Sequence, residues 1–221
     1  VAIIPDGGSL NEIIAEEKGI IHLQLVAKGV SAHAARPWLA VNALERLTTA
    51  ITKIKAYFAT FKPSNLDPED LDTHWYSTCV ETIIETPNDS PNRIPETASA
   101  VLDIRFVPPL TQQDILGEIG NLLDEGITAE PIIIADPTHL APDTQFIDVT
   151  SDITGASAHL VRSSGGSDGR FFSAQGIPVL ISRPYVGNLH GRNEWIDIES
   201  MVSYFDICRS YILNYNSSKS N

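Results

Sequence analysis

The sequence has no long apolar run and only one methionine. None of its apolar stretches approaches the roughly 18 to 20 residues that span a membrane, and the first residues, VAIIPDGG, have no basic region before their short apolar run. The sequence therefore predicts neither a membrane segment nor a targeting signal. No initiator methionine precedes Val1, where a strand pattern already begins, so we expect the chain to be a piece of a longer protein.

Cysteines and basic residues are also scarce. Cys79 and Cys208 are too few and too far apart for a disulfide framework or a CxxC metal knuckle, so a reducing, cytoplasmic location is the default expectation. The 15 basic residues face 28 acidic ones, which gives a formal charge of −13 without any basic stripe. We therefore expect no nucleic-acid partner and no membrane partner, whereas small substrates or metal cations suit this charge.

The composition is that of a globular protein, with 43% hydrophobic and 19% charged residues. The middle of the chain has the pattern of a two-layer domain. Leu23 and Leu25 alternate with His22 and Gln24, as in a half-buried strand. The expected elements are strands at 20–27, 75–84, 98–106 and 131–135, a helix at 41–61 with one apolar stripe, and a helix that a capping box opens at Thr111 and Gly126 ends. Their order, β-α-β-β-α-β, predicts a ferredoxin-like sandwich.

The rest of the chain alternates helices and strands. From residue 143 onward we expect a helix, a strand at 158–162, a short helix, a strand at 177–182 and a long helix at 198–215, which indicates a parallel α/β sheet. Two or three strands cannot make a sheet covered on both faces. The sequence therefore predicts an incomplete α/β domain.

The segment SSGGSDGRF, which begins at Ser163, has the features of an anion-binding loop. Gly165 and Gly166 can bring backbone N–H groups close to an anion, and Ser167 or Asp168 can cap a helix that begins at Gly169. A phosphate-binding loop is an alternative. The segment lacks the Walker lysine and the GxGxxG spacing, which argues against that alternative.

Three isolated residues could carry chemistry. His190 lies in a loop after a predicted buried strand, Asp6 ends the opening strand, and His33 is flanked by small residues that leave its ring free to reach a ligand. Each has a plain alternative: a surface histidine, a turn aspartate, and a loop histidine bonded to nearby backbone. Taken singly, none of them establishes a metal or catalytic site.

Taken together, four segments carry a family resemblance: GVSAHAARP followed by an amphipathic helix, NRIPETASAVLDIRF, SSGGSDGRF and NLHGRNEWI. They resemble the di-zinc metallopeptidase family of aminoacylases, carboxypeptidase G, acetylornithine deacetylase, succinyl-diaminopimelate desuccinylase and carnosinase-like dipeptidases. The resemblance covers essentially the whole chain and keeps the order of the motifs.

The resemblance implies a domain organisation. In that family an α/β catalytic domain carries two zinc ions, for which cobalt or manganese can stand in, and an inserted ferredoxin-like domain acts as a lid and usually as the dimerisation surface. Residues 1–18 then correspond to the end of the N-terminal part of the catalytic domain, 19–136 to the lid, and 137–221 to the C-terminal part. A homodimer through the lid is expected.

The resemblance also assigns roles. Asp6 and His190 match metal ligands, and His33 matches the lid histidine that reaches into the partner's active site and polarises the scissile carbonyl. Asn92 and Arg105 match lid positions that contact substrate.

The anion loop receives a role in the same way. Gly165, Gly166 and Ser167 match the loop that meets the substrate carboxylate, and Arg170 is a further candidate for that anion. Two zinc ions lower the pKa of a bound water to about 7, and a nearby carboxylate serves as general base.

The chain departs from the family pattern in one respect. The other metal ligands and the glutamate base precede the lid in that family, and we expect them upstream of Val1. No HxD pair replaces them, and Glu16–Glu17 lies where the family has no metal ligand. The expected function of the full-length protein is zinc-dependent hydrolysis of amide bonds in N-acyl amino acids or small peptides. The alternative is a non-catalytic dimerisation module.

Overall fold

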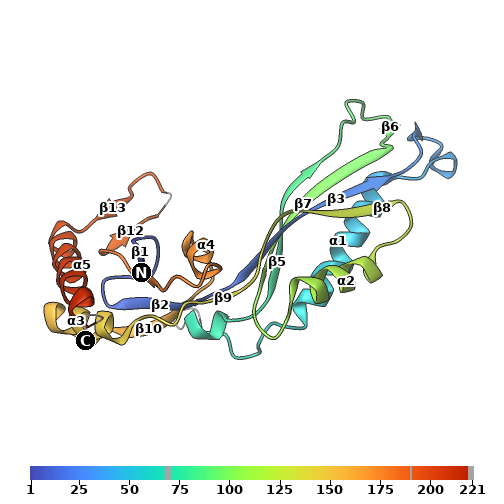
Figure 1. The fold of residues 1–221 in the computed structure, drawn as a ribbon. Coiled ribbons are helices and arrows are strands. Elements are labelled where there is room, and N and C mark those ends of the chain that lie inside the picture. Colours follow the sequence, from blue (N-terminus) through green and yellow to red (C-terminus); the bar gives the residue numbers. More distant parts are fainter. Residues whose placement is uncertain (68–70, 190, 219–221) are drawn as a thin grey trace. The chain divides into compact units, whose positions relative to one another are not determined.

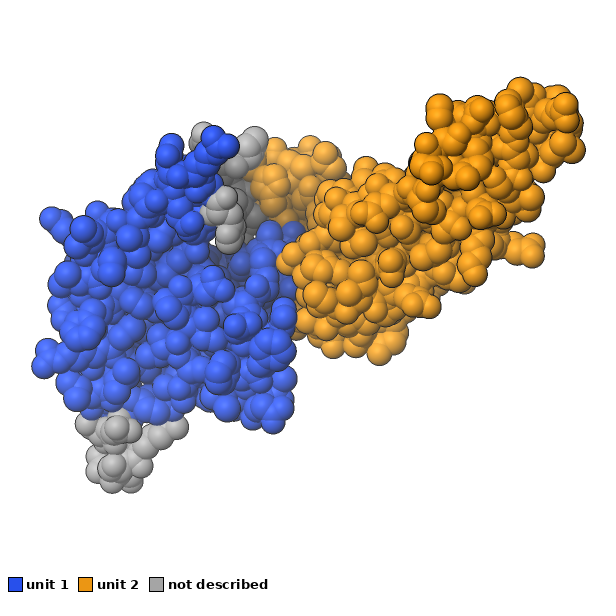
Figure 2. Space-filling model, turned by 90° about the horizontal axis from the view of Figure 1, so that it is seen from above, with its two compact units in different colours: residues 1–18, 138–221 blue, residues 19–137 orange. Residues whose placement is uncertain are grey.

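The chain folds into two compact units. The computed structural model describes residues 1–67, 71–189 and 191–218. One unit, here called the inserted unit, is Gly19–Pro137, and the other, called the split unit, combines Val1–Lys18 with Thr138–Asn221 (Figure 2). Among the described helices, none combines the length and the apolar character that a membrane crossing requires.

The inserted unit is a four-stranded antiparallel sheet with two helices on one face (Figure 1). Its strand order is β5-β7-β3-β8, which places the first and third strands of the unit at the centre, as in a ferredoxin-like sandwich. The elements are β3 (Gly19–Lys28), α1 (Ala43–Ala59), β5 (Thr78–Glu85), β7 (Thr97–Phe106), α2 (Gln112–Leu122) and β8 (Ile127–Ala135). The predicted fold class of this unit is confirmed.

Alternation along the central strands, strict in β7 and present in β3 from Ile21 onward, builds the core of the inserted unit. Every second residue of β7 is buried, from Ala98 to Phe106, and Leu23 and Leu25 of β3 are fully buried. The stripe of α1 packs on the same core through Leu47, Ile51, Ile54 and Phe58. Each such side chain contributes about 1.5 to 3 kcal/mol when buried, so this sheet–helix contact is the main source of the unit's stability.

Local signals set the helix ends. The predicted capping box of α2 is present, with Thr111 accepting from the Asp114 backbone and the Asp114 side chain accepting from the Thr111 backbone. The helix ends at Leu122 rather than at Gly126, because Leu123 is already extended. Gly126 instead takes a left-handed φ of 84° just before β8, which begins earlier than predicted and pairs with β3 along most of its length.

Among its described residues the split unit contains three small sheets, of which the third is the short antiparallel pair of β12 (Val186–Gly187) and β13 (Trp195–Ile196). Strand β1 (Ala2–Ile4) pairs in parallel with β11 (Val179–Ile181), and the second sheet has the order β10-β2-β9. Its strands are β2 (Glu12–Glu17), β9 (Thr138–His139) and β10 (His159–Ser163). Parallel pairing occurs in the first two of these sheets, as predicted, but the strands predicted at 158–162 and 177–182 lie in different sheets rather than in one, and β2, the central strand of the second sheet, is absent from the prediction.

Helices cover these sheets. Helices α3 (Thr144–Thr154) and α5 (Ile198–Ser218) meet at Phe146 and Tyr211, whose rings make an edge contact with centroids 5.3 Å apart. The Tyr211 hydroxyl donates to Asp143, the N-cap of α3, at 2.9 Å. Both cysteines are free. The remaining elements are η1 (Pro37–Leu39), η2 (Leu71–His74), β4 (Ala32–His33), β6 (Arg93–Ile94) and α4 (Gly169–Ser173).

Candidate functional site

Asp6 lies in an exposed turn directly after β1. The turn depends on Gly8, which has a left-handed φ of 62° and would place a Cβ against the carbonyl oxygen of Glu12. Only glycine fits there without strain. The chain thus leaves the end of a parallel strand in a fixed turn, and the Asp6 carboxylate is presented at that point.

The loop between β10 and α4 presents backbone donors, as the sequence predicts. Gly165 and Gly166 are exposed, whereas Ser167 is only 5% exposed. The Gly165 N–H donates to the Ser163 hydroxyl at 3.2 Å, and the Gly169 N–H donates to the Ser167 hydroxyl at 3.0 Å. Helix α4 begins at Gly169 as predicted. Of the two predicted caps, Ser167 makes the side-chain bond and Asp168 makes none.

Arg170 folds back onto this loop. A Cβ built on Gly166 would lie 3.6 Å from the Arg170 Nη1 atom, so the guanidinium lies beside the glycine pair. The Arg170 guanidinium carbon also lies 4.8 Å from the centroid of the Phe171 ring, a cation–π arrangement. A guanidinium beside exposed backbone N–H groups is suited to binding a carboxylate.

Glu17, which the sequence analysis set aside, belongs to the same environment. It ends β2 and is only 2% exposed. Burial raises the pKa of its carboxyl group, and the negative charge of Asp6 adds to that rise, while hydrogen bonds from Ser167 and the charge of Arg170 oppose it. Asp6, Glu17, Ser167 and Arg170 are therefore close enough to influence one another electrostatically.

Asp6 is the one predicted metal ligand among the described residues. His190, the second predicted ligand, lies outside the described residues. In the part of the chain that the structure describes, no group of three or more His, Cys, Asp or Glu side chains could hold a metal. The exposed Asp6 carboxylate is a donor of the kind that zinc, cobalt and manganese accept, so it fits the role of a single ligand.

His33 and Asn92 meet in the inserted unit. Strands β4 and β6 pair with His33 opposite Arg93, and the Ala34 N–H donates to the Asn92 carbonyl at 2.8 Å. The exposed His33 ring accepts a hydrogen bond at Nδ1 from the Ala35 N–H at 3.1 Å. A neutral imidazole that accepts at Nδ1 carries its proton on Nε2, so His33 presents an N–H donor to solvent.

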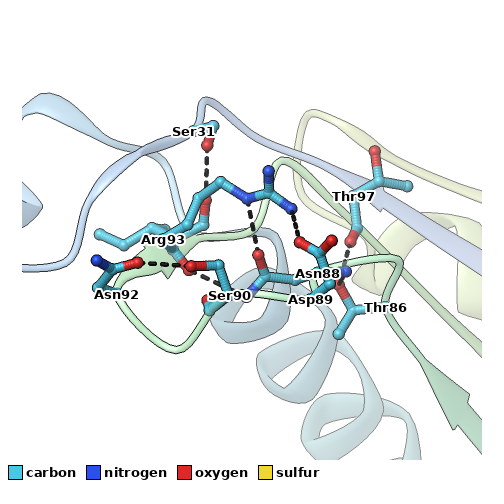
Figure 3. Close-up of polar contacts among 9 residues, drawn as sticks. Ser31, Thr86, Asn88, Asp89, Ser90, Asn92, Arg93 and Thr97 are labelled. Carbon is cyan, nitrogen blue, oxygen red and sulfur yellow. Dashed lines mark hydrogen bonds and ion pairs between the residues drawn. The ribbon is translucent and has the colours of Figure 1, made fainter.

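Polar contacts fix the segment that carries Asn92 (Figure 3). Arg93 donates to Asn88 at 2.9 Å and to Asp89 at 2.8 Å, and the Ser90 hydroxyl donates to the Asn92 side-chain oxygen at 2.6 Å. The Asn92 amide nitrogen points away from this cluster. A cavity of about 290 Å³ adjoins the cluster; its lining residues are Ser31, Thr86, Pro87, Asn88, Arg93, Pro95, Glu96 and Thr97.

Arg105 lies at the other end of β7. On the sheet face away from the helices it forms a two-point ion pair with Asp103, at 2.6 and 2.9 Å, and His22 lies 3.2 Å from the same carboxylate. Burial opposes ionisation of Asp103, but the Arg105 hydrogen bonds and charge outweigh it, and the pKa of Asp103 is lowered. Arg105 is thus held rigidly, well away from His33 and Asn92.

Comparison with known proteins identifies the family. A model of the peptidase dimerisation domain matches residues 15–128, more than half of the chain. The chain belongs to the M20 family of metallopeptidases. The resemblance read from its motifs is therefore confirmed at the level of the family.

Individual relatives of this M20 chain agree with that identification. It is 32% identical over 201 residues to a succinyl-diaminopimelate desuccinylase of Acidiphilium cryptum, with 86% of the chain and 50% of the relative covered. The corresponding enzyme of Phenylobacterium zucineum is 31% identical over 172 residues, which cover 71% of the chain and 42% of the relative. The chain spans about half the length of the curated relatives it matches.

Solved structures share the fold. The aminopeptidase PepT of Bacillus cereus superposes with a TM-score of 0.72 at 16% identity, covering 93% of the chain and 54% of PepT. The dipeptidase Dug1p of Saccharomyces cerevisiae gives a TM-score of 0.69 at 16% identity, covering 97% of the chain and 59% of Dug1p. At this identity the likeness shows the fold alone.

Proposed function

We propose that the full-length protein containing this chain is a metal-dependent hydrolase of amide bonds in N-acyl amino acids or small peptides. The observation that carries the proposal is the arrangement in the split unit, where a metal-type donor, Asp6, shares an electrostatic environment with an anion-binding loop and Arg170. A metallo-hydrolase acting on carboxylated substrates needs both features in one place. The succinyl-diaminopimelate desuccinylases, at 31 and 32% identity, support the same reaction class.

In this proposal the substrate carboxylate lies at the loop of Gly165, Gly166 and Ser167. The Gly165 N–H is bonded to the Ser163 hydroxyl, so the Gly166 N–H donates to the carboxylate, and the Arg170 guanidinium supplies the opposite charge. Charge-assisted bonds of this kind orient the substrate, so that its scissile bond is held at a fixed distance from the reacting groups. The loop therefore favours substrates with a free carboxylate near the amide bond.

Asp6 and His190 would hold the metal, two zinc ions per complete active site, with cobalt or manganese as alternatives. The remaining ligands and the general base belong, in this proposal, to parts of the full-length protein beyond the 221 residues. Bound zinc would supply Lewis acidity and lower the pKa of water to about 7. We further propose a cytoplasmic location, consistent with the two free cysteines.

The geometry of the inserted unit supports a homodimer in which this unit acts as a lid. Strand β6 lies beyond the Thr97 end of β7 (Figure 1). His33 pairs with β6, and Asn92 directly precedes it, whereas Arg105 is near the other end of β7. The eight residue-to-residue steps from Thr97 to Arg105 span about 27 Å of strand, at about 3.4 Å per step. A small substrate cannot touch both ends of one lid. We therefore assign Arg105 to the substrate of its own subunit and His33 and Asn92 to that of the partner.

The test is hydrolysis by the full-length protein of N-acyl amino acids and dipeptides, before and after chelation. We expect turnover that is lost on metal removal and restored by zinc, cobalt or manganese. Turnover that survives complete metal removal would contradict the proposal. A stable dimer that binds no metal and hydrolyses none of these substrates would favour the alternative, a dimerisation module without metal chemistry.

A further inference from the structure

Glu17 is a buried carboxyl group that the proposed function does not use. Its side chain is 2% exposed, and among the described residues its Oε2 atom has no hydrogen-bond partner. A buried polar atom without a partner destabilises a fold by about 1 to 3 kcal/mol. Folding alone therefore does not explain a glutamate at this position.

The neighbouring residue on the strand provides a contrast. Glu16 is partly exposed and pairs with Arg162 at 3.1 Å and with His139 at 3.4 Å. This is an ordinary surface cluster, in which ion pairs contribute little. Glu16 and Glu17 thus carry the same side chain on adjacent residues. Glu16 forms ion pairs at the surface, whereas Glu17 is buried and one of its carboxyl oxygens has no hydrogen-bond partner among the described residues.

Glu17 is tied to both ends of the anion-binding loop. At the start of the loop, the register of β2 and β10 places Glu17 opposite Ser163, and the Lys18 N–H donates to the Ser163 carbonyl at 3.1 Å. At the end of the loop, the buried Ser167 lies close enough to the Glu17 carboxyl group for its hydroxyl and backbone to lower the pKa of that group. Only Ser164 and the glycine pair, all exposed, lie between these two attachments.

A chain of hydrogen bonds continues from Glu17 into α4. The Ser167 hydroxyl oxygen accepts from the Gly169 N–H at 3.0 Å, and its O–H is the group that a neighbouring carboxylate, which can only accept, attracts. Glu17 therefore favours the orientation of Ser167 in which its oxygen faces Gly169. Arg170 follows in the first turn of α4, so its approach to Gly166 depends on the same chain.

We propose that Glu17 is a positioning residue for substrate binding: it holds Ser167 and Ser163 at the two ends of the loop, so that the Gly166 N–H and the Arg170 guanidinium converge on the substrate carboxylate. This role rests on the proposed function. It differs from metal binding and from proton transfer, because Glu17 acts on the substrate only through the loop.

The kinetic test compares Glu17→Ala and Glu17→Gln in the full-length protein, with Glu16→Ala as the matched control. For a substrate with a free carboxylate, Glu17→Ala is expected to raise KM about tenfold with little change in kcat, since a lost set of buried hydrogen bonds weakens binding by about that factor. Glu17→Gln keeps one acceptor oxygen and is expected to recover part of the loss. For the same substrate with its carboxylate amidated, the variants and the wild type are expected to have equal KM values.

A double-mutant cycle with Ser167→Ala tests whether Glu17 acts through Ser167. The effects of Glu17→Gln and Ser167→Ala on KM are expected to be strongly non-additive, because both break the same chain of bonds. Additive effects, or a fall in kcat with KM unchanged, would overturn the proposed role.

Amide hydrogen exchange separates this inference from the proposed function. Glu17→Ala and Glu17→Gln are expected to accelerate exchange in the segment 165–169, whereas Glu16→Ala leaves it unchanged. Unchanged exchange in both Glu17 variants overturns the inference whatever the activity of the protein. Faster exchange in a protein that hydrolyses no amide contradicts the proposed function and leaves the anchoring of the loop by Glu17 standing.

Discussion

Replacing His33 with alanine in the full-length protein is expected to lower kcat by about 100-fold or more, the usual loss when a donor to the developing oxyanion is removed. His33 is exposed, and its Nδ1 atom is occupied by the Ala35 N–H, so Nε2–H is the group available to a substrate carbonyl. The proposed metal ligands, Asp6 and His190, do not belong to the inserted unit, so the metal content of the variant is expected to be unchanged. Steady-state kinetics measures kcat, and metal analysis of the same samples measures the metal content.

The control for this variant is His74→Ala. His74 is a second histidine of the inserted unit, and one of its ring nitrogens contacts the Asp67 carbonyl oxygen at 2.9 Å, away from β4 and β6. Its replacement is expected to leave kcat unchanged. If His33→Ala instead removes metal, or changes kcat by less than about twofold, the assignment of His33 to carbonyl polarisation is wrong.

Replacing Asp6 with asparagine is expected to lower metal affinity and activity by at least about 100-fold. Even residues that only hydrogen-bond to a metal ligand, without binding the metal, alter metal affinity by about 10- to 100-fold when they are replaced. Asparagine keeps the size of the side chain and the turn at Gly8, and removes only the negative charge. The measurements are metal content after dialysis against a weak chelator, and kcat/KM at saturating metal.

Asp152→Asn is the matched control for Asp6→Asn. Asp152 is an exposed residue of α3 in the same unit, so its replacement changes the net charge equally. We expect full metal content and full activity in this control. Unchanged metal affinity in Asp6→Asn would show that the carboxylate at the end of β1 is not a ligand.

The inserted unit could be predicted from the sequence because its signals are local and agree with one another. Alternation along β3 and β7 assigns Leu23, Leu102 and their neighbours to the core, and the capping box at Thr111 marks the start of α2. In a sheet covered by helices on one face only, burial follows the period of two directly. The sequence therefore predicts both the strands and helices of this unit and the face of each central strand that is buried.

Strand β2 could not be predicted, because its sequence EIIAEE does not alternate. It is the central strand of three, its pairing with β10 shifts register between Val161 and Arg162, and buried residues follow one another at Ile13 and Ile14. Glu17 was missed for the related reason that glutamate is rarely buried. Its one signal in the sequence is its place at the end of a short apolar run, which is equally typical of a surface turn.

The sequence suggests which residues form the candidate site, but it predicts only part of how those residues lie relative to one another. The loop of Gly165 to Ser167 and its companion Arg170 are neighbours in sequence, so their proximity follows from the local pattern. His33 and Asn92 meet through a two-residue pairing of β4 with β6, too short to leave a strand pattern. The distance between His33 and Arg105 depends on the register of the whole sheet, which only the structure provides.

The central claim is that each active site combines the split unit of one subunit with His33 of the other. Co-expression of His33→Ala and Asp6→Asn subunits with different tags, followed by isolation of the mixed dimer, tests it most directly. In the mixed dimer one site has an intact Asp6 and receives an intact His33 from its partner, and the other site lacks both.

Neither parent homodimer has a complete site, so both are expected to be inactive. The account predicts that the isolated mixed dimer recovers roughly half of the wild-type kcat per dimer, as one of its two symmetry-related sites is complete. A mixed dimer as inactive as its parents would contradict the account, because it would mean that His33 serves its own subunit or no site at all.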